Sequence, residues 1–193
     1  MSTPRLAIFI SGGGRTALNI ADQIDNGQLD AQIAVVVASR PCAGHDRCKE
    51  RGLPVMIERG EIPEARLTEI LDEARADLVC LAGYLKLMPI PAGWQGRVLN
   101  IHPALLPKHG GPGMFGDRVH RSVLESGEHI SGCTVHICDG EFDRGPIVVQ
   151  KSCEVLPGDT VDTLAERVFC VECAAYPEAI RTTLKTLGLD ADA

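Results

Sequence analysis

The hydrophobic residues follow two alternating spacings along the first hundred positions. Continuous apolar runs at 6–10 and 33–38 are typical of strands buried on both faces of a parallel sheet. Between them, apolar residues recur at helical spacing from Ala17 to Ile24, and Asn26-Gly27 provides a helix end. This alternation predicts βαβ units.

Similar segments continue to position 101. Strands are predicted at 54–57, 77–83 and 97–101, with one helix before Gly52 and another beginning near Pro63, which suits a first helical turn. The order βαβαβαβ predicts a doubly wound, mostly parallel, Rossmann-like α/β sheet.

The pattern changes after position 101. A Pro/Gly-rich loop at 102–116 precedes a helix that ends at Gly127. Strands at 134–137 and 147–150 are close enough in sequence for an antiparallel pair, and a long helix at about 160–184 contains Pro177, where a kink is expected. Without a repeat or linker, residues 1–193 are expected to form a single domain.

Composition narrows the class of protein. The 193 residues are 45% hydrophobic, and no run of about 18 apolar residues would span a membrane. The apolar run at 6–10 is too short for a signal peptide, so a cytoplasmic location is expected. The 26 acidic residues outnumber the 19 basic ones and give a net charge of −7, so small-molecule partners are favoured over nucleic acid.

The eight cysteines are expected to be reduced thiols, since no secretory signal is recognised. Cys170 and Cys173 have the spacing of a metal-binding pair, but no second pair completes a zinc site. No metal is therefore predicted.

A glycine-rich turn at 11–16 (S-G-G-G-R-T) joins the first predicted strand to the first helix. Such a turn can direct backbone N–H groups at an anion in front of the helix N-terminus, and Arg15 and Thr16 add a charge and a hydroxyl. The turn predicts a phosphate site; the alternative is a tight turn that binds nothing.

The same turn also fits the dinucleotide pattern G-x-G-x-x-[GA] through Gly12, Gly14 and Ala17. The second strand is followed by Arg40 rather than by an acid for a ribose hydroxyl, which leaves an NADP-binding protein open. The Walker pattern is absent, which argues against ATP.

Asn100 and His102 are two residues apart at the end of the fifth predicted strand. Since side chains alternate along a strand, both face the same side of the sheet. An amide and an imidazole suit a carbonyl whose oxygen gains negative charge during attack, although both could be structural. An acidic turn at 139–143 matters if Asp143 lies beside His102, where we expect it to raise the pKa of that histidine.

Four segments in this order resemble glycinamide ribonucleotide formyltransferases, the folate-dependent enzymes of purine synthesis. They are 10–14 (I-S-G-G-G), 81–84 (L-A-G-Y), 99–107 (L-N-I-H-P-A-L-L-P) and 143–146 (D-R-G-P). The N-I-H-P-x-L-L-P run is the most specific of them. The resemblance covers about 6–184 and implies that the half at about 1–100 binds a phosphate and that about 101–187 completes a folate cleft.

The resemblance also implies residue roles. The catalytic residues correspond to Asn100, His102 and Asp143. The substrate phosphate site corresponds to Gly13, Gly14, Arg15 and Thr16, and a glutamate that contacts the ribonucleotide corresponds to Glu172. The folate-lining residues correspond to Tyr84, Leu85, Lys86, Leu87 and Met88, with Asn100, Asp139 and Gly140 opposite them.

This chain departs from the family pattern at two places. Arg15-Thr16 replaces the usual Ser-Asn of the phosphate loop, and we expect Arg15 to neutralise the phosphate instead. The loop at 109–116 resembles a longer, glycine-rich bacterial form, which suggests a mobile flap over the folate with His120 at its far end.

The implied reaction is attack of the substrate amine on the formyl carbon of 10-formyltetrahydrofolate, with Asn100 and protonated His102 at the oxyanion and Asp143 assisting proton transfer.

The expected protein is a monomer or homodimer without nucleic-acid or membrane partners. A formyltetrahydrofolate hydrolase and a methionyl-tRNA formyltransferase are disfavoured because each needs a further domain, for which the ends of this sequence leave no room. An NADP-dependent oxidoreductase or a nucleotide-binding module without catalysis remains the alternative from another class.

Overall fold

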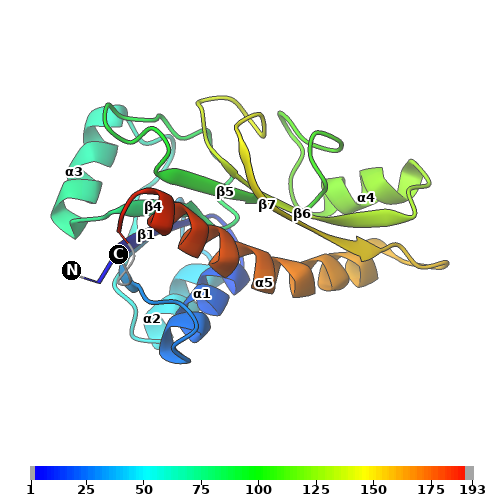
Figure 1. The fold of residues 1–193 in the computed structure, drawn as a ribbon, viewed down its shortest axis with the longest axis horizontal. Coiled ribbons are helices and arrows are strands. Elements are labelled where there is room, and N and C mark those ends of the chain that lie inside the picture. Colours follow the sequence, from blue (N-terminus) through cyan, green and yellow to red (C-terminus); the bar gives the residue numbers. More distant parts are fainter. Residues whose placement is uncertain (1–2, 190–193) are drawn as a thin grey trace.

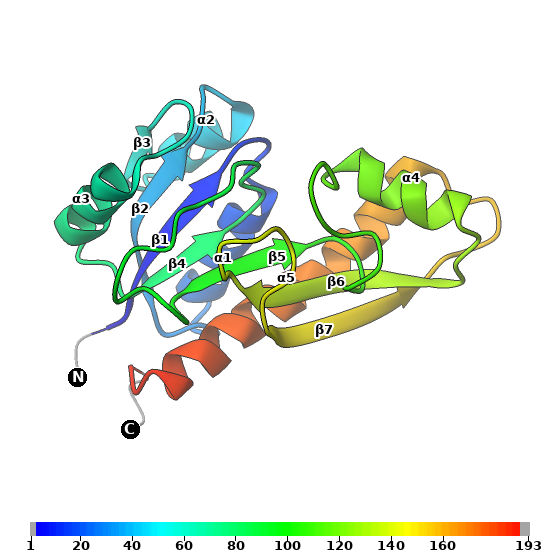
Figure 2. The same cartoon turned by 90° about the horizontal axis from the view of Figure 1, so that it is seen from above.

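The computed structural model describes residues 3–189, which form a mixed sheet flanked by helices (Figures 1 and 2). The strands are β1 (Arg5–Ile10), β2 (Gln32–Ala38), β3 (Val55–Ile57), β4 (Leu78–Leu81), β5 (Val98–His102), β6 (Ile130–Ile137) and β7 (Ile147–Glu154). The helices are α1 (Arg15–Asp25), α2 (Ala43–Glu50), α3 (Glu64–Ala74), α4 (Asp117–Glu125) and α5 (Val161–Thr186).

The sheet has the order β3-β2-β1-β4-β5-β6-β7. Strands β1 to β5 pair in parallel, whereas β6 pairs antiparallel with both β5 and β7. The predicted doubly wound, mostly parallel sheet with an antiparallel carboxy-terminal part is therefore confirmed.

The two antiparallel strands are longer than predicted. Strand β6 begins at Ile130 rather than at 134, and β7 continues to Glu154 rather than ending at 150. The extension pairs Gly132 with Ser152, and a side chain at Gly132 would collide with the backbone of Lys151. Because glycine and polar residues interrupt the apolar pattern there, hydrophobic spacing alone ended these strands too early.

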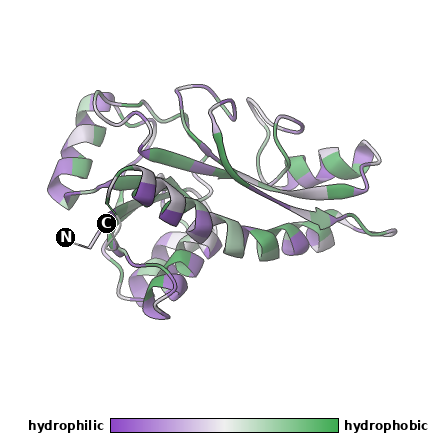
Figure 3. Cartoon of the chain, in the orientation of Figure 1, coloured by the Kyte–Doolittle hydropathy of each residue, from purple (hydrophilic) through white to green (hydrophobic). Residues whose placement is uncertain are grey.

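The core lies on both faces of the sheet. In β1, Leu6, Ile8 and Ile10 join one buried cluster, while Ala7 and Phe9 join the cluster on the opposite face. Figure 3 shows this as largely hydrophobic strands between helices with many hydrophilic positions. A continuous apolar run is what a parallel strand covered on both faces requires.

Helix α5 packs against β6 and β7 and also contacts α1 and α4. It continues as one helix through the buried Pro177 to Thr186. Among the described residues, no helix combines the length and the apolar character needed to cross a bilayer.

Tyr176 connects this helix to the middle of the sheet. Its ring is fully buried, and its hydroxyl lies 2.9 Å from the carbonyl oxygen of Leu81 and 3.1 Å from that of Leu99. Leu81 is the last residue of β4 and Leu99 lies near the start of β5, so the hydroxyl fixes α5 to the two strands that lead into the candidate site.

Tyr176→Phe should lower the free energy of unfolding by about 1–2 kcal/mol, because two buried carbonyl groups lose a shared donor. Urea denaturation followed by circular dichroism measures the change. Tyr84→Phe, which removes a hydroxyl beside the cavity, is the matched control. An unchanged denaturation midpoint for Tyr176→Phe would show that the hydroxyl contributes no net stability.

Candidate functional site

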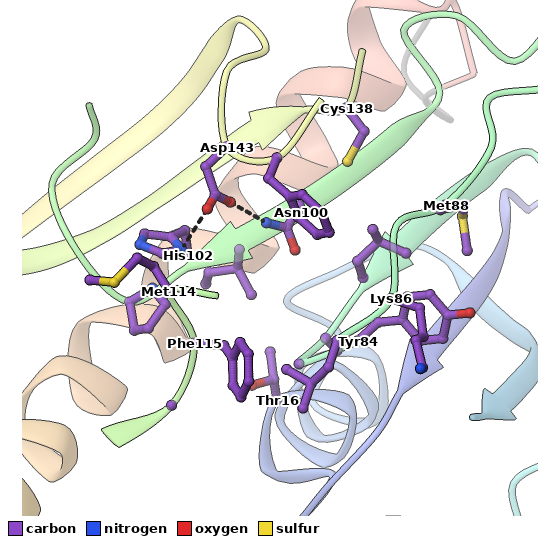
Figure 4. A pocket seen from close by; sticks show the side chains of 18 of the residues that line it. Thr16, Tyr84, Lys86, Met88, Asn100, His102, Met114, Phe115, Cys138 and Asp143 are labelled. Atoms are coloured by element: carbon purple, nitrogen blue, oxygen red, sulfur yellow. Dashed lines mark hydrogen bonds and ion pairs between the residues drawn. The ribbon is translucent and has the colours of Figure 1, made fainter. Parts of the chain in front are cut away.

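A cavity of about 410 Å³ opens where β1, β4 and β5 end (Figure 4). The glycine turn after β1, the segment after β4 and the last residues of β5 all line it. Loop residues 111–116 and the turn at 140–143 cover the opposite side. Ligands of open α/β sheets bind at the carboxyl ends of parallel strands, so the cavity lies where this fold places a site.

Asn100, His102 and Asp143 meet at one end of the cavity. Asn100 Nδ2 lies 3.3 Å from Asp143 Oδ1, and His102 Nδ1 lies 3.4 Å from Asp143 Oδ2. Strand β5 presents the first two side chains, and Asp143 reaches them from a turn in which its own backbone has a φ of 57°. The spatial adjacency that the sequence could not establish is therefore present.

Asp143 raises the pKa of His102, as predicted, but the net pKa of this histidine is lowered. Burial lowers the pKa of His102, whose exposed fraction is 3%, and this effect outweighs the opposing influence of Asp143 and of the His109 carbonyl. Burial alone would raise the pKa of Asp143, but hydrogen bonds and charge from His136 and His102 and the Gly111 N–H bring it below its usual value. Of these two residues, Asp143 is therefore the one that the site stabilises in its charged form.

The first residues of the loop at 109–116 contact both His102 and Asp143. The carbonyl oxygen of His109 lies 2.8 Å from His102 Nε2, and the Gly111 N–H donates to Asp143 Oδ2 over 2.9 Å. Between them, Gly110 has no room for a side chain because a Cβ would collide with Leu106. Further along the loop, Met114 and Phe115 line the cavity, whereas His120 is buried in α4.

A further histidine, His136, contacts this group and was not predicted from the sequence. This residue lies in β6 directly opposite Asn100, and its Nε2 is 3.1 Å from Asn100 Nδ2 and 3.5 Å from Asp143 Oδ1. The available signal was a histidine within an otherwise apolar strand segment, which by itself does not indicate a site. Phe169 of α5 also lines the cavity without having been predicted. Met114 and Phe115 line it from the loop at 109–116, for which a place over the folate was expected.

The glycine turn is shaped by close packing against α2. Gly14 precedes α1 with a φ of 71°, and a Cβ there would lie 2.7 Å from the Cα atom of Gly44. No side chain caps the first turn of α1. Its backbone N–H groups can therefore receive an anion at the cavity, which Gly13, Gly14, Arg15 and Thr16 all line.

Arg15 points toward α5. Its Nη2 lies 2.6 Å from Glu166 Oε2, and its guanidinium carbon lies 3.8 Å from the centre of the Phe169 ring. The hydrogen bonds that Arg15 donates to Glu166 raise the pKa of Arg15. The positive charge that we expected at a phosphate is thus already balanced by a carboxylate in this structure.

Glu172 lies one turn of α5 beyond Phe169 and is not among the cavity-lining residues. Burial raises the pKa of its carboxyl group to about 7, although nearby Arg15 acts in the opposite direction. A glutamate behind Arg15, outside the cavity lining, therefore changes charge near neutral pH.

The residues expected to line a folate site are mostly at the cavity. Those that line it are Tyr84, Leu85, Lys86, Leu87, Met88, Asn100 and Gly140. Asp139 does not; its Oδ1 instead accepts a hydrogen bond from the Glu141 N–H. The exposed Leu85 and Leu87 give this wall an apolar surface suited to a flat ring.

The residues that suggested NADP binding or metal binding have no such arrangement in the part of the chain that the structure describes. Arg40, which left an NADP-binding protein open, donates from Nε to the carbonyl oxygen of Ser11 over 3.0 Å. Burial raises the pKa of the Cys138 thiol beside the cavity to about 12. Cys170 and Cys173 lie in α5, and among residues 3–189 no group of three or more acidic, cysteine or histidine side chains could hold a metal.

Comparison with known proteins gives a consistent result. The model of the family described as formyl transferase matches residues 4–180. The chain is 36% identical over 186 residues to the chloroplastic phosphoribosylglycinamide formyltransferase of Arabidopsis thaliana, a match that covers 91% of this chain and 64% of that protein. It is 37% identical over 187 residues to the trifunctional purine biosynthetic protein adenosine-3 of Drosophila melanogaster, covering 91% of this chain and 14% of that protein. The chain thus spans less than two thirds of each of these relatives.

Solved structures match over nearly their whole length. Glycinamide ribonucleotide transformylase 1 from Symbiobacterium toebii gives a TM-score of 0.86 at 36% identity, covering 96% of this chain and 89% of that one. Phosphoribosylglycinamide formyltransferase from Brucella melitensis gives 0.83 at 33% identity, covering 98% and 97%.

The charge of Glu172 predicts a pH-dependent stability. Its pKa rises from an ordinary 4.5 to about 7 on folding, so its stabilising contribution is complete below 4.5 and is lost as pH rises through about 7. Relative to Glu172→Gln, the wild-type free energy of unfolding should fall by about 2 kcal/mol between pH 5 and pH 8.

Urea denaturation at several pH values measures this difference, and Glu166→Gln is the matched control. The pKa of Glu166 is lowered by Arg15, so its contribution should stay constant over the same interval. Parallel pH profiles for wild type and Glu172→Gln would contradict the prediction.

Proposed function

The chain belongs to the formyl transferase family, and we propose that it transfers the formyl group of 10-formyltetrahydrofolate to the amine of 5′-phosphoribosylglycinamide in purine (IMP) biosynthesis. The names of its relatives and structural neighbours support this substrate pair. The observation that carries the proposal is the convergence of Asn100, His102 and Asp143 at a cavity that ends in a glycine turn.

The two substrates fit different parts of the cavity. We assign the phosphate of the ribonucleotide to the N–H groups at 13–16, where the free first turn of α1 favours an anion. We assign the pterin of the folate to the apolar wall at 84–88, opposite the turn at 139–143. Glu172, close enough to Arg15 for their charges to interact, is assigned to the ribonucleotide side.

The whole sequence then acts as one formyltransferase domain. Residues at about 1–100 provide the phosphate turn, and residues at about 101–187 complete the folate cleft. This division follows the sheet, because the parallel strands carry the glycine turn and the antiparallel strands carry His136 and lead into Asp143.

The reaction requires one nucleophilic attack and two proton movements. The amine lone pair forms a bond to the formyl carbon while the carbonyl π electrons move to oxygen. Asp143, through a water molecule, accepts the proton that the attacking nitrogen loses. An oxygen lone pair of the intermediate then re-forms the C=O bond while the C–N bond to folate breaks. The electrons of that bond leave with the folate nitrogen, which receives a proton from His102.

His102 is also assigned to the developing oxyanion. In the structure its Nε2 faces the His109 carbonyl, so that carbonyl must move away before the N–H can reach the substrate. Glycines at 110, 111 and 113 give the loop the freedom for such a movement. Binding of folate against Met114 and Phe115 would couple the movement to occupancy of the cleft.

His102→Ala should reduce turnover by about 10³-fold or more while leaving the fold intact, because both the oxyanion donor and the proton donor are lost. The assay follows folate absorbance after 10-formyltetrahydrofolate and glycinamide ribonucleotide are mixed. His120→Ala, which removes another buried histidine, is the control.

Near-normal activity of His102→Ala would refute the assigned role. Formate release without the amine substrate would instead support a formyltetrahydrofolate hydrolase. Consumption of NADPH by the wild-type protein would support an oxidoreductase.

Glu166→Gln should lower the KM for glycinamide ribonucleotide several-fold, because it releases the Arg15 charge toward the phosphate. Steady-state kinetics with each substrate varied in turn measures this effect, and the KM for the folate should not change. Glu178→Gln, which breaks the ion pair with Lys151 elsewhere on α5, is the control. A higher KM for the ribonucleotide would show that Glu166 itself contributes to binding.

A further inference from the structure

A second cavity, of about 320 Å³, lies next to the loop that contacts His102. None of the residues that line it also lines the cavity of the candidate site. It is formed by residues just before and at the start of the loop, by α4 and by the beginning of β6. Its volume is in the range of cavities that bind small molecules. Most of its lining side chains are apolar: Leu105, Leu106, Pro107, Val123 and Ile130.

Two buried polar atoms at this cavity have no hydrogen-bond partner within residues 3–189. They are Oγ of Ser131, a residue with an exposed fraction of 2%, and Nε2 of His109. Only two other buried side-chain atoms of the described chain are in this state, His120 Nδ1 and Thr183 Oγ1, and neither residue lines the cavity. Because a buried polar atom without a partner is costly, their concentration here favours a ligand that supplies hydrogen bonds.

The charges at the cavity neutralise each other. Lys108 Nζ lies 2.7 Å from Glu128 Oε1, so the ammonium group and the carboxylate that line the cavity are already paired. A charged ligand would lose its hydration without gaining a free counter-ion, whereas a neutral ligand avoids this cost.

The two polar atoms without a partner also limit the chemistry of the ligand. The Ser131 hydroxyl can donate or accept, and His109 Nε2 does one or the other according to its tautomer. A primary amide carries both a carbonyl group and N–H groups, so it complements both atoms with either tautomer.

We propose that this cavity binds a small neutral molecule with an aliphatic body and one amide group, and that its occupancy restrains the adjoining loop. The amide contacts Ser131 Oγ and His109 Nε2, while the body packs against apolar side chains such as Val123.

His109 connects the second cavity with the candidate site. Its ring Nδ1 lies 2.9 Å from Ser122 Oγ of α4, and its backbone carbonyl oxygen lies 2.8 Å from His102 Nε2. A ligand on Nε2 would fix this ring at both nitrogens and so favour the position in which the carbonyl covers His102. This consequence rests on the proposed function, in which the carbonyl has to move away. Occupancy of the second cavity should then slow formyl transfer.

Binding is the first test, with 3-methylbutanamide as the probe, and it needs no enzymatic activity. In ¹H–¹⁵N spectra of protein labelled at histidine, the ring signals of His109 should shift with a Kd on the order of 1 mM. His109→Asn assigns these signals. The anion of the same shape, 3-methylbutanoate, should bind at least about fivefold more weakly, because its charge has no free partner.

Two variants test which atoms hold the probe. Ser131→Ala removes the hydroxyl but keeps the apolar lining, and it should weaken probe binding by about threefold to tenfold. The matched control is Thr183→Val, which removes another buried hydroxyl without a partner in the described chain and should bind the probe like wild type. Since neither substitution breaks a hydrogen bond of its side chain within residues 3–189, both variants should fold.

Kinetics test the restraint on the loop. A saturating concentration of 3-methylbutanamide should lower the kcat of the wild-type protein several-fold when both substrates are saturating. Ser131→Ala should need an about threefold to tenfold higher probe concentration for the same inhibition. Without the probe, both variants should turn over like wild type.

Unchanged His109 signals at probe concentrations well above the expected Kd would overturn the proposal, and so would equal affinities of wild type and Ser131→Ala. Equal binding of 3-methylbutanoate would overturn the assignment to a neutral ligand, and binding that leaves kcat unchanged would overturn the restraint on the loop. A wild-type protein without formyl transfer would refute the proposed function, whereas the titration would still decide whether the second site exists.

Discussion

A single buried carboxylate organises this structure around its cavity. The Asp143 side chain is only 8% exposed, and a charge with so little water around it is tolerated only where donors surround it. Asn100 and the Gly111 backbone supply hydrogen bonds, and His102 lies within ion-pair distance. These groups come from β5 and from the loop that follows it. The hydrogen bonds to the Asp143 carboxylate therefore connect β5, this loop and the turn at 139–143, which are distant in the sequence.

The same requirement explains the unusual backbone near the site. Asp143 has a φ of 57°, a conformation that most side chains disfavour. At Gly110 a Cβ would collide with the Leu106 side chain and would lie 3.2 Å from the Asp143 Cβ. Such strain persists only where surrounding contacts determine the conformation. Here the contacts are the hydrogen bonds to the carboxylate, so the turn and the loop are held by the charge that they enclose.

The sequence predicted best those features that a short local pattern specifies. Apolar runs predicted the parallel strands, and the glycine turn and the Asn100–His102 alternation placed candidate groups where strands end. It was least informative for partners fixed by packing. The pairing of Arg15 with Glu166 joins residues 151 positions apart, and His136 gains its partner only through the register of β6 on β5. Neither has a local pattern.

The net pKa of His102 depends on packing in the same way. A neighbouring carboxylate raises the pKa of a histidine, but the amount of water that remains around the ring depends on the complete fold. Here the loop excludes that water, and desolvation outweighs the attraction of Asp143. A ring that is reluctant to hold its charge is a stronger proton donor once charged. If His102 gains its proton only as an oxyanion forms beside it, the burial that opposes the charged resting state would favour transfer to the departing nitrogen.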